Sequence, residues 1–538
     1  MCYIIKIIKQ IMGNIKKYIF KRKGEKFPEP MVISMDITSG DTIVQPINLY
    51  LPDGRVLIDW GDGTKTIYRE GEDATNKTHT YTSTGIFDVS ISIVFGTFDT
   101  QTYSDHSLKI LELKQWGTSA FELIKFTYSS NMIVTATDIP DFSATTSFEN
   151  LFYGCSSITT VPNINNWDVS NITSLLSTFS GCILFNDDIS NWDVSSVVAL
   201  DGAFSYCYAF NQPLNGWTLN SSITSLFRTF KQARAFNQPL SNWILPNLNT
   251  LRETFFGAYA FNQDISMWDV SKVTTMLSTF EMAYNFNQPI GTWDTSSLVD
   301  LTATFKNADS FNQYIGDWDV SKVTKFIFTF NSTNVFNQPL TNWVTTSAQS
   351  MNGMFGVTSA FQQDIQFFDT VGVTDMSYMF SNSAYNQPLN NLYVGDVTTM
   401  RSMFNKGNYN YPLDNWDTGN VITMQEMFQN NTAFNQDISM WNVSSVTNMI
   451  AMFKNGVFNQ DISSWNISNV TSMADMLANN SISTVNYDLL LNAWSLLTVT
   501  PNVTLTVNTN YTIATSQSAR DILTNAPNNW TIIDDGGI

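Results

Sequence analysis

Apolar and polar positions along most of the chain repeat with a period of 23 to 26 residues. One complete unit runs from Trp268 to Thr292 and reads WDVSKVTTMLSTFEMAYNFNQPIGT. The apolar positions of this unit are Trp268, Val270, Val273, Met276, Phe280, Ala283, Phe286 and Ile290. Most of them are three or four residues apart, whereas the stretches WDVS and FNQP carry Asp, Ser, Asn and Pro.

Two aromatic landmarks keep this period and define thirteen units. The first opens a unit at Trp167, Trp192, Trp217, Trp243, Trp268, Trp293, Trp318, Trp343, Trp416, Trp441 and Trp465. Two degenerate units carry Phe368 and Leu392 at this position. The second landmark falls at Phe179, Phe204, Phe230, Phe255, Phe280, Phe305, Phe330, Phe355, Phe380, Phe404, Phe428 and Phe453. Self-similarity this regular indicates a stacked repeat array.

The spacing of three and four residues is typical of helices, so a solenoid of helix pairs is one alternative. Such repeats need about 33 residues or more, whereas leucine-rich-type coils use about 20–29. The WDVS and FNQP stretches also favour turns over helix interiors. We therefore expect a short strand around residues 273–276, one or two helical turns through residues 280–283, and extended turns that complete the coil. Because one unit cannot bury its own aromatic residues, stacked neighbours should pack Trp on Trp and Phe on Phe.

Two stretches carry a resemblance to a known family. They read FNQDISMWDVSKVTTM (Phe261–Met276) and FNQDISMWNVSSVTNM (Phe434–Met449). The phrase resembles FNQDISxWDVSxVTxM of the BspA-like leucine-rich repeat surface proteins, a family of bacteria, protists and large DNA viruses. The resemblance extends over roughly residues 110–538. It implies a leucine-rich-repeat-like solenoid, with a short parallel strand and a short helix or turn in each coil, and surface exposure, without any agreed chemistry.

The thirteen-coil array, residues 167–485, is expected to carry a cap at each end. The phrases LELKQWG (residues 111–117) and FENLFYGC (residues 148–155) resemble the start of such arrays, so residues 99–166 are interpreted as the N-terminal cap. Residues 486–538 form the predicted C-terminal cap. Its pattern predicts a helix over residues 486–495, a strand over 503–507, a helix over 517–525 and a strand over 530–534. A capped array is soluble and able to exist as a monomer.

Residues 31–98 alternate apolar and polar positions between turn signals, which predicts strands. The phrases IDWGDGT (residues 58–64) and HTY, followed by GIFDVSI (residues 85–91), resemble the PKD domain, a seven-stranded immunoglobulin-like sandwich. The resemblance implies a spacer or binding module. Asp59, Asp62 and His79 are of the types that bind metals, but a GDG turn needs glycine at positive φ. We interpret these three residues as structural.

The body of the chain is acidic, which argues against a nucleic-acid partner. The formal net charge is −19, from 27 basic and 46 acidic residues, with 43% apolar and 14% aromatic residues. Residues 1–30 differ, because they hold eight Lys or Arg and only two Glu. We interpret this segment as a basic, apolar tail or anchor that ends in a linker.

Two interpretations of the N-terminal segment stay open. Lys6 and Lys9 interrupt its apolar run and no small-residue cleavage site follows, so no secretory signal is predicted. The run is also too short and too charged to span a bilayer. The segment is either a tail that is disordered or docks onto an assembly partner, or an interfacial membrane anchor. The anchor interpretation includes myristoylation of Gly13 after an internal start at Met12.

No constellation of catalytic residues is found in the sequence, and we predict no enzyme, no cofactor and no metal site. The only histidines are His79 and His106, both outside the array, and no standard nucleophile, zinc or phosphate-binding motif occurs. Asp269, Asp294 and Asp319 recur one coil apart. Calcium between coils is one reading of this column, and capping of backbone N–H groups is the one we favour. An asparagine column should likewise satisfy a turn: Asn211, Asn237, Asn262, Asn287, Asn312 and Asn337.

Three cysteines occupy one site on successive coils. Cys155, Cys182 and Cys207 each follow a landmark phenylalanine by three residues. Stacked coils bring equivalent Cα atoms to roughly 5 Å, inside the range of a disulfide, but in-register side chains point the same way. We expect a buried column of thiols, with room for one bridge between neighbours and no metal.

A ligand of the array, if one exists, should bind the outward face of the strands, on both sides of the buried Met276 position. The predicted face consists of Thr275, Asp300, Lys325, Asp375, Arg401, Gln425 and Asn448. These side chains vary from coil to coil while the core positions stay fixed. Variation of this kind is also what a neutral surface would show.

We expect a non-enzymatic, surface-exposed repeat protein that mediates attachment or recognition at a cell surface, in the extracellular space or on a virion surface. The expected partner is a protein or glycan on a host or neighbouring surface, and not a nucleic acid, with the N-terminal tail on a membrane or an assembly partner. The alternative is a structural or decorating component of a large DNA virus particle or of a surface layer. The lack of a secretion signal favours this alternative, and the family resemblance favours recognition.

Overall fold

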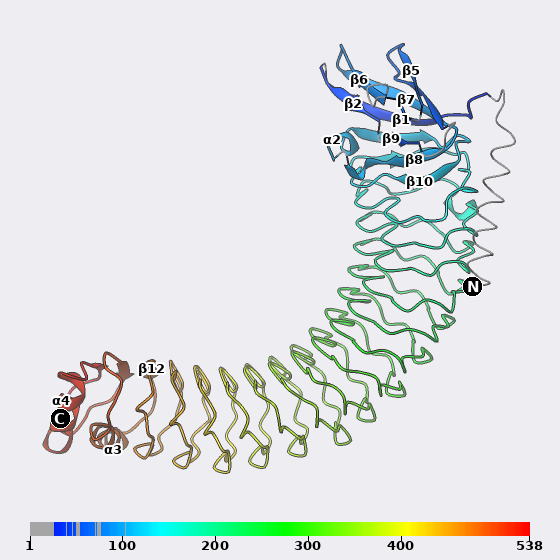
Figure 1. Cartoon of the computed structure of the whole chain (residues 1–538). Coiled ribbons are helices and arrows are strands. Elements are labelled where there is room, and N and C mark those ends of the chain that lie inside the picture. Colours follow the sequence, from blue (N-terminus) through cyan, green and yellow to red (C-terminus); the bar gives the residue numbers. More distant parts are fainter. Residues whose placement is uncertain are drawn as a thin grey trace. The chain divides into compact units, whose positions relative to one another are not determined.

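The computed structural model describes residues 26–38, 40–45, 47–49, 54–69, 71–72, 77–102 and 104–538. The chain divides into two compact units, Met1–Asn247 and Leu248–Ile538 (Figure 1). The predictions of a tail or an anchor rest mainly on residues 1–25, which lie outside the described residues. The predicted array, residues 167–485, contributes coils to both units.

The first unit begins with a six-stranded sheet in the order β11-β9-β1-β7-β4-β5. Its strands are β1 (Met31–Ile37), β4 (Arg55–Asp59), β5 (Lys65–Arg69), β7 (Gly85–Ile93), β9 (Ile110–Gln115) and β11 (Ile133–Val134). β1 pairs antiparallel with β7, and β7 pairs antiparallel with β4. The pattern in β1 and β4 is as expected for a sheet with a packed face, because Ile33, Met35, Val56 and Ile58 are fully buried.

The described residues of this region also form two smaller sheets and three short helices. β2 (Thr42–Val44) pairs with β6 (Thr78–Thr80), and β8 (Gly96–Asp99) lies between β3 (Ile47–Asn48) and β10 (Phe121–Lys125). The helices are η2 (Thr100–Thr102), α2 (Ser104–Ser107) and η3 (Ile164–Asn166).

The predicted boundary between residues 98 and 99 runs through continuous sheets. β9, which the sequence assigns to the cap, pairs antiparallel with β1 of the predicted module, and β10 pairs parallel with β8 (Figure 1). The module and the first part of the cap therefore share backbone hydrogen bonds. Pairing between strands almost 80 residues apart is not visible in a local pattern, which is why the sequence separates these segments.

The coils of the first unit stack in register after this region. Ser174 forms parallel bridges with Ser147 on one side and Ala199 on the other. The rings of Trp167 and Trp192 are 6.2 Å apart, with an angle of 16° between their planes. This is the Trp-on-Trp stacking that the sequence predicts, and the same unit also stacks Phe152, Phe179, Phe204 and Phe230.

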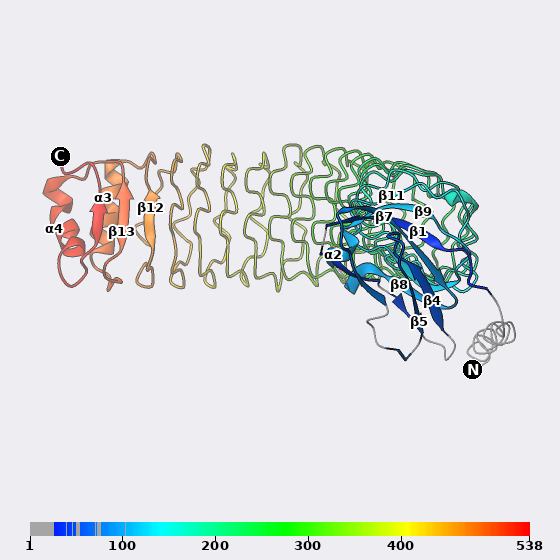
Figure 2. The ribbon, with the colours of Figure 1, turned by 90° about the horizontal axis from the view of Figure 1, so that it is seen from above.

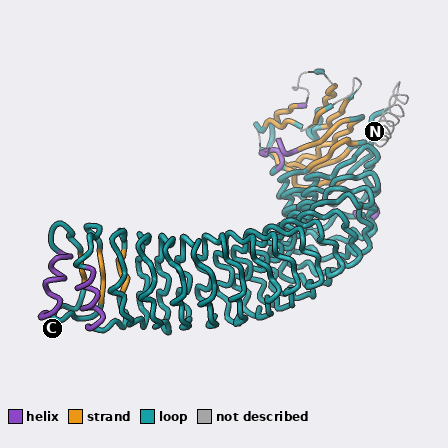
Figure 3. Tube along the Cα trace, turned by 60° about the horizontal axis from the view of Figure 1, so that its bottom comes forward, coloured by secondary structure: helices purple, strands orange, loops and turns teal. Residues whose placement is uncertain are grey.

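Apart from the last coil, which begins at Trp465, the coils of the second unit contain neither the predicted strand nor the predicted helical turns. In the unit that begins at Trp268, only Thr275 forms a β-bridge, and residues 277–282 form consecutive turns. Figure 3 shows these coils as loops, with strands and helices of this unit only near its C-terminal end. The prediction of a strand around residues 273–276 and of helix through residues 280–283 is therefore wrong.

Backbone hydrogen bonds explain this difference. The N–H groups of Met276, Ser278, Phe280 and Met282 donate to carbonyl oxygens of the next coil at 2.8–3.0 Å. The N–H groups between them close turns within the coil, as Thr279 does onto the carbonyl oxygen of Met276 at 3.0 Å. Ser278 and Met282 adopt positive φ angles of 53° and 60°. This alternation gives the three- and four-residue apolar spacing of a helix without a helical hydrogen-bond pattern.

Three aromatic columns form the core of the second unit. The landmark phenylalanines stack with ring centroids 5.8 Å apart for Phe255 and Phe280 and 5.7 Å for Phe280 and Phe305. A second phenylalanine six residues later, Phe286, stacks 4.0 Å from Phe280 within its own coil. The tryptophans form the third column, and Trp318 is 1% exposed. Burial of these rings is the main source of stability in the array.

The C-terminal end of the chain has the elements that the sequence predicts. They are α3 (Thr484–Trp494), β13 (Thr504–Val507), α4 (Ile513–Thr524) and β14 (Thr531–Ile533). β13 pairs parallel with β14 and with β12 (Met473–Leu477), the last strand of the coils (Figure 2). The predicted helix–strand–helix–strand order is confirmed, and the helices begin two to four residues earlier than expected.

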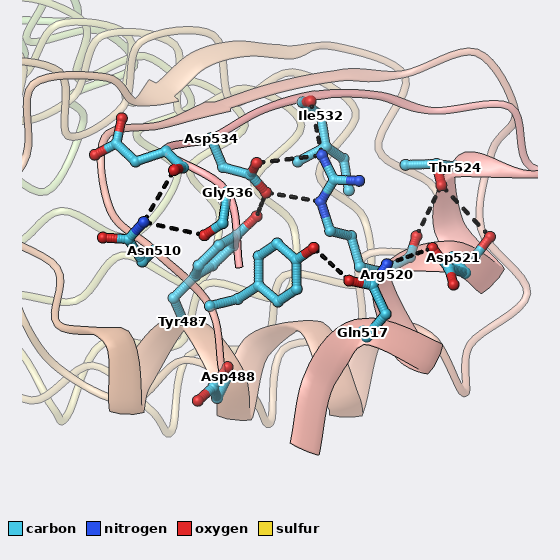
Figure 4. A network of polar contacts seen from close by, with 12 residues as sticks. Tyr487, Asp488, Asn510, Gln517, Arg520, Asp521, Thr524, Ile532, Asp534 and Gly536 are labelled. Atoms are coloured by element: carbon cyan, nitrogen blue, oxygen red, sulfur yellow. Dashed lines mark hydrogen bonds and ion pairs between the residues drawn. The ribbon is translucent and has the colours of Figure 1, made fainter. Parts of the chain in front are cut away.

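A buried ion pair holds these C-terminal elements together (Figure 4). Nε of Arg520 in α4 donates to Oδ2 of Asp534 at 2.8 Å, and the hydroxyl of Tyr487 in α3 donates to the same oxygen at 2.8 Å. The Asp534 side chain is 3% exposed. The hydrogen bond to Asp534 raises the pKa of Arg520.

Candidate binding face

The core fixes the position of each coil with hydrogen bonds as well as ring stacking. The indole Nε1 of Trp318 donates to the carbonyl oxygen of Ile290 in the preceding coil at 3.0 Å, and Trp343 repeats the bond to Ile315 at 2.9 Å. Because the bond needs one register between neighbouring coils, side chains at equivalent positions form straight columns. The backbone that carries the outer side chains therefore repeats from coil to coil.

The aspartates that directly follow the landmark tryptophans cap turns, as we predicted. Oδ1 of Asp269 accepts the N–H and the hydroxyl of Ser271 at 3.1 and 2.6 Å. These hydrogen bonds hold the pKa of the Asp269 carboxyl below its usual value. Asp294 and Asp319 accept the N–H of the residue two positions later in the same way.

The asparagine column also satisfies backbone groups, as predicted. Oδ1 of Asn262 accepts the N–H of Asn287 at 2.9 Å, and Oδ1 of Asn287 accepts that of Asn312 at 3.0 Å. The next glutamine adds a bond, because Nε2 of Gln288 donates to Oδ1 of Asn262 at 2.8 Å. The repeated FNQ phrase is therefore explained by a ladder of amides between coils.

The predicted face combines two neighbouring columns. Five of the predicted residues form the single bridge of their coil: Thr275, Asp300, Lys325, Asp375 and Asn448. The other two, Arg401 and Gln425, follow the bridge residue of their coil by two positions. We call the first the bridge column; it contains Thr250, Thr275, Asp300, Lys325, Ser350, Asp375, Thr399, Thr423, Asn448 and Ser472. We call the second the variable column; it contains Leu277, Thr302, Ile327, Asn352, Ser377, Arg401, Gln425 and Ile450.

Residues of the bridge column have a structural task. Oδ1 of Asp300 accepts the N–H of Thr302 at 2.9 Å, and Oδ1 of Asp375 accepts the N–H of Ser377 at 2.8 Å. Thr, Ser, Asp and Asn are the residues that satisfy a backbone N–H two positions later. The exposed Lys325 cannot accept such a bond. The residue types in the bridge column differ from coil to coil, but most of them are types that can cap the backbone N–H two positions later.

Residues of the variable column show no such restriction. They range from the aliphatic Ile327 to the exposed cation Arg401 and the amide of Gln425. Some link the two columns: Nδ2 of Asn352 donates to Oδ2 of Asp375 at 2.9 Å, and Nδ2 of Asn448 donates to Oε1 of Gln425 at 3.3 Å. The variable column is therefore the better candidate for recognition.

Aromatic and cationic side chains beside the variable column were missed by the sequence reasoning. Phe328 has a φ of 53° and its ring covers Gly353, where a Cβ would lie 2.3 Å from the ring. Lys306 lies over this ring at 5.7 Å, and Arg401 lies over the ring of Tyr378 at 5.7 Å. Such pairs place a cation and an aromatic surface together. Neighbouring coils carry small residues at this position, so the large rings of Phe328 and Tyr378 could have been noticed in the sequence.

The residues considered for a metal in the N-terminal sheet behave as structural groups. Oδ2 of Asp62 lies 2.6 Å from Nε2 of His79, whose ring stacks on Trp60 with centroids 5.0 Å apart. Asp59 instead pairs with Lys65 at 2.7 Å. Gly61 and Gly63 have φ angles of 80° and 93°, as the predicted turn needs. Across the described ranges, no group of three or more His, Cys, Asp or Glu is placed to hold a metal ion.

The three array cysteines form a buried column of free thiols. Sγ of Cys155 donates to the carbonyl oxygen of Phe126 at 3.0 Å, and Cys182 and Cys207 donate to Phe152 and Phe179 in the same way. Burial raises the pKa of all three thiols. The predicted thiol column is present, without a bridge between neighbours.

These stacked, register-locked coils define a repeat protein. A protein-family model described as "Mycoplasma protein of unknown function, DUF285" matches residues 146–266, 224–343, 299–409 and 383–494. The matches cover more than half of the chain, so the chain belongs to this family. None of the curated proteins matches it. Among the helices that the structure describes, none is long and apolar enough to cross a membrane.

Proposed function

We propose that the protein is a non-enzymatic recognition or attachment protein of the BspA-like leucine-rich repeat type, exposed at a cell, extracellular or virion surface. Its array is a leucine-rich-repeat-like solenoid, preceded by an immunoglobulin-like, PKD-like module. The four matches to a repeat family support the repeat part of this proposal. The variable column supplies the recognition surface.

One observation carries the proposal. Many positions of each coil serve the core, a turn or an inter-coil hydrogen bond, whereas the variable column changes its chemistry from coil to coil. Ile327, Arg401 and Gln425 differ in size, charge and hydrogen bonding while their neighbours keep the same ladder. A constant scaffold that presents a changing row of side chains is the usual design of a repeat protein that binds an extended partner.

The chemistry of the face indicates a protein or a glycan as the partner. Arg401 over Tyr378 offers a cation beside an aromatic ring, a combination common in the centre of protein interfaces. The net charge of −19 would repel a nucleic acid. In this proposal the N-terminal segment contacts a membrane or an assembly partner.

The test replaces four residues of the variable column together: Thr302→Ala, Ile327→Ala, Arg401→Ala and Gln425→Ala. The labelled full chain is applied to immobilised surface proteins and glycans, and the bound fraction is measured. We expect the variant to lose at least about tenfold in affinity, which corresponds to 1.4 kcal/mol. A control with Met267→Ala and Met440→Ala, two side chains that are 81% and 80% exposed, should bind as the parent does. Equal binding by all three proteins would remove the proposal, and self-association of the chain in its place would favour the structural alternative.

A further inference from the structure

A polar groove crosses several coils of the second unit. It has a volume of about 470 Å³ and is open to solvent. Val357, Asn382, Lys406 and Asn408 contribute exposed side chains to it. These residues follow the landmark phenylalanine of their coils, whereas the bridge and variable columns precede it. The groove is thus separate from the proposed binding face.

The groove has an origin in the sequence. In most coils the second aromatic residue follows the landmark by six residues, as Phe361 follows Phe355. In three coils the distance is five residues, from Phe380 to Tyr385, from Phe404 to Tyr409 and from Phe453 to Phe458, and only the first two of these coils are adjacent. The aromatic columns nevertheless stay in register, because Tyr385 stacks on Phe361 with centroids 5.9 Å apart. In these coils the loop between the two aromatic residues, which lies outside the core, is therefore one residue shorter.

The longer loops on both sides form the walls of this recess. Val357 and Ser359 come from the coil before the two adjacent short ones, and Thr432 comes from the coil after them. Hydrogen bonds fix the floor, since the Thr358 and Ser383 hydroxyls lie 2.9 Å apart and the N–H of Asn382 donates to the carbonyl oxygen of Asn405 at 2.6 Å. The floor of the groove is therefore held by hydrogen bonds between neighbouring coils.

The groove lining favours an anion with many hydroxyl groups. Asn382, Asn408 and Thr432 offer amide and hydroxyl groups that both donate and accept hydrogen bonds, and the Ser359 hydroxyl, which donates to the carbonyl oxygen of Asn334 at 2.9 Å, offers an acceptor. No Asp or Glu lines the groove, although the chain has 46 acidic and 27 basic residues. Lys406 is exposed in the groove and forms no ion pair with any carboxylate of the described residues. No aromatic ring lines the groove, which disfavours the base stacking that holds single-stranded nucleic acid.

We propose that this groove binds an acidic oligosaccharide, with a sugar carboxylate at the Lys406 ammonium. The amide and hydroxyl groups of Asn382, Asn408 and Ser359 pair with sugar hydroxyls, and the exposed side chain of Val357 packs against a C–H face of a sugar ring. This groove site is proposed independently of the variable column, so an experiment can contradict either proposal alone.

Binding is measured on the full chain by isothermal titration with three acidic probes: a galacturonic acid hexamer, a mannuronic acid hexamer and sialyllactose. The methyl ester of the galacturonic acid hexamer serves as a neutral probe of the same shape. We expect at least one acidic probe to bind and the ester to bind at least about tenfold more weakly. Raising the salt concentration should weaken binding of the acidic probe, because the Lys406 contact is exposed to solvent.

Two variants connect this binding to the groove. Lys406→Gln removes the cation and should reduce the affinity for the acidic probe about tenfold, while Lys325→Gln, the same change at an exposed lysine of the bridge column, should not. An alanine inserted between Ser383 and Ala384 restores the six-residue spacing and should abolish binding by filling the recess. Should the insertion impair folding, the Lys406→Gln comparison still decides.

Three results would overturn the proposal. The first is that none of the acidic probes binds at millimolar concentration. The second is an equal loss of affinity in Lys406→Gln and Lys325→Gln, which would indicate general charge attraction. The third is that a hexaglutamate peptide binds more tightly than every acidic saccharide, which would make an acidic peptide the ligand. The four-alanine variant of the variable column should bind the acidic probe as the parent does, so the two proposals are tested separately.

Discussion

Trp318 shows how a single repeated residue serves the array. Its ring stacks 6.1 Å from that of Trp293, and its Nε1 donates to the carbonyl oxygen of Ile290 at 3.0 Å. The side chain thus adds apolar burial and also satisfies a backbone acceptor of the preceding coil. The column tolerates a smaller ring only where the sequence is degenerate, as at Phe368, which stacks 6.4 Å from Trp343.

Replacement of Trp318 should therefore be costly. We expect Trp318→Ala to reduce the free energy of unfolding of the second unit by about 3–5 kcal/mol, because a buried ring and its hydrogen bond are lost. Trp318→Phe, which copies the residue found at Phe368, should cost only about 1–2 kcal/mol. Urea unfolding followed by tryptophan fluorescence measures both. Similar stability of the parent and the alanine variant would contradict the stacking argument.

His106 offers a second test at the residue scale. Its side chain is 5% exposed, and neither ring nitrogen has a hydrogen-bond partner among the residues that the structure describes. Burial, with a smaller contribution from the nearby Lys109 charge, lowers the pKa of His106 from 6.5 to about 4. A histidine with a lowered pKa favours the neutral form in the folded state. Its stabilising effect is complete above pH 6.5 and is lost as the pH falls towards 4.

We expect the parent to lose about 3 kcal/mol more than His106→Phe between pH 6.5 and 4, since each pKa unit corresponds to 1.36 kcal/mol. The other titrating groups are common to both proteins, so their contributions cancel in the comparison. Thermal unfolding of the first unit at a series of pH values provides the measurement. Parallel pH profiles for the two proteins would show that His106 does not titrate in this way.

At the scale of the element, the sequence predicted some parts well and others poorly. The α3–β13–α4–β14 order was readable because each element has its own local pattern of apolar positions. The strand and helix expected in each coil were wrong, because Ser278 and Met282 take positive φ although neither is glycine. That conformation is stabilised by hydrogen bonds to the next coil, which a local pattern cannot show.

The candidate binding face was also predicted only in part from the sequence. All seven predicted residues fall in two neighbouring columns of the coils, the bridge column and the variable column. The sequence alone could not distinguish the bridge column from the variable column. Thr, Asp and Asn in the bridge column appear unconstrained until the structure shows that Asp300 accepts the N–H of Thr302. The groove at Lys406 was missed, although the five-residue spacing of Phe404 and Tyr409 was its visible signal.

The Arg520–Asp534 pair allows a prediction for the C-terminal elements. Asp534 is almost fully buried and also accepts the Tyr487 hydroxyl, so removal of the guanidinium leaves a buried charge without its cation. We expect Arg520→Leu to destabilise the second unit by about 3 kcal/mol. The more exposed pair of Lys454 and Asp475, at 2.7 Å and with side chains 30% and 44% exposed, is the control, and Lys454→Leu should change stability by less than about 1 kcal/mol. Equal effects in chemical denaturation would mean that burial of the pair does not matter.

At the scale of the whole molecule, each coil depends on its neighbours for its core. Phe453 stacks on Phe428 of the preceding coil at 5.7 Å, and its N–H donates to the carbonyl oxygen of Met476 in the last coil at 2.9 Å. The final coil has no further coil to cover it, so α3, β13, α4 and β14 must close the array. They do so through the pairing of β12 with β13 and through hydrogen bonds such as that from Nδ2 of Asn486 to the carbonyl oxygen of Asn459 at 2.9 Å. Terminal caps of this kind keep repeat arrays soluble.

A chain that ends at Ser483 should therefore aggregate. The truncation removes β13 from β12, which leaves a row of unpaired backbone groups at the edge of the array. It also uncovers apolar residues of the last coil, such as Met473 and Leu477, both fully buried in the intact protein. Light scattering during size-exclusion chromatography should show large species for the truncated chain. Leu496→Ser in the full chain changes a side chain that is 84% exposed in the same region and should elute as the parent does. A truncated chain that stays monomeric would show that the last coil closes the array by itself, and that the C-terminal elements serve another purpose.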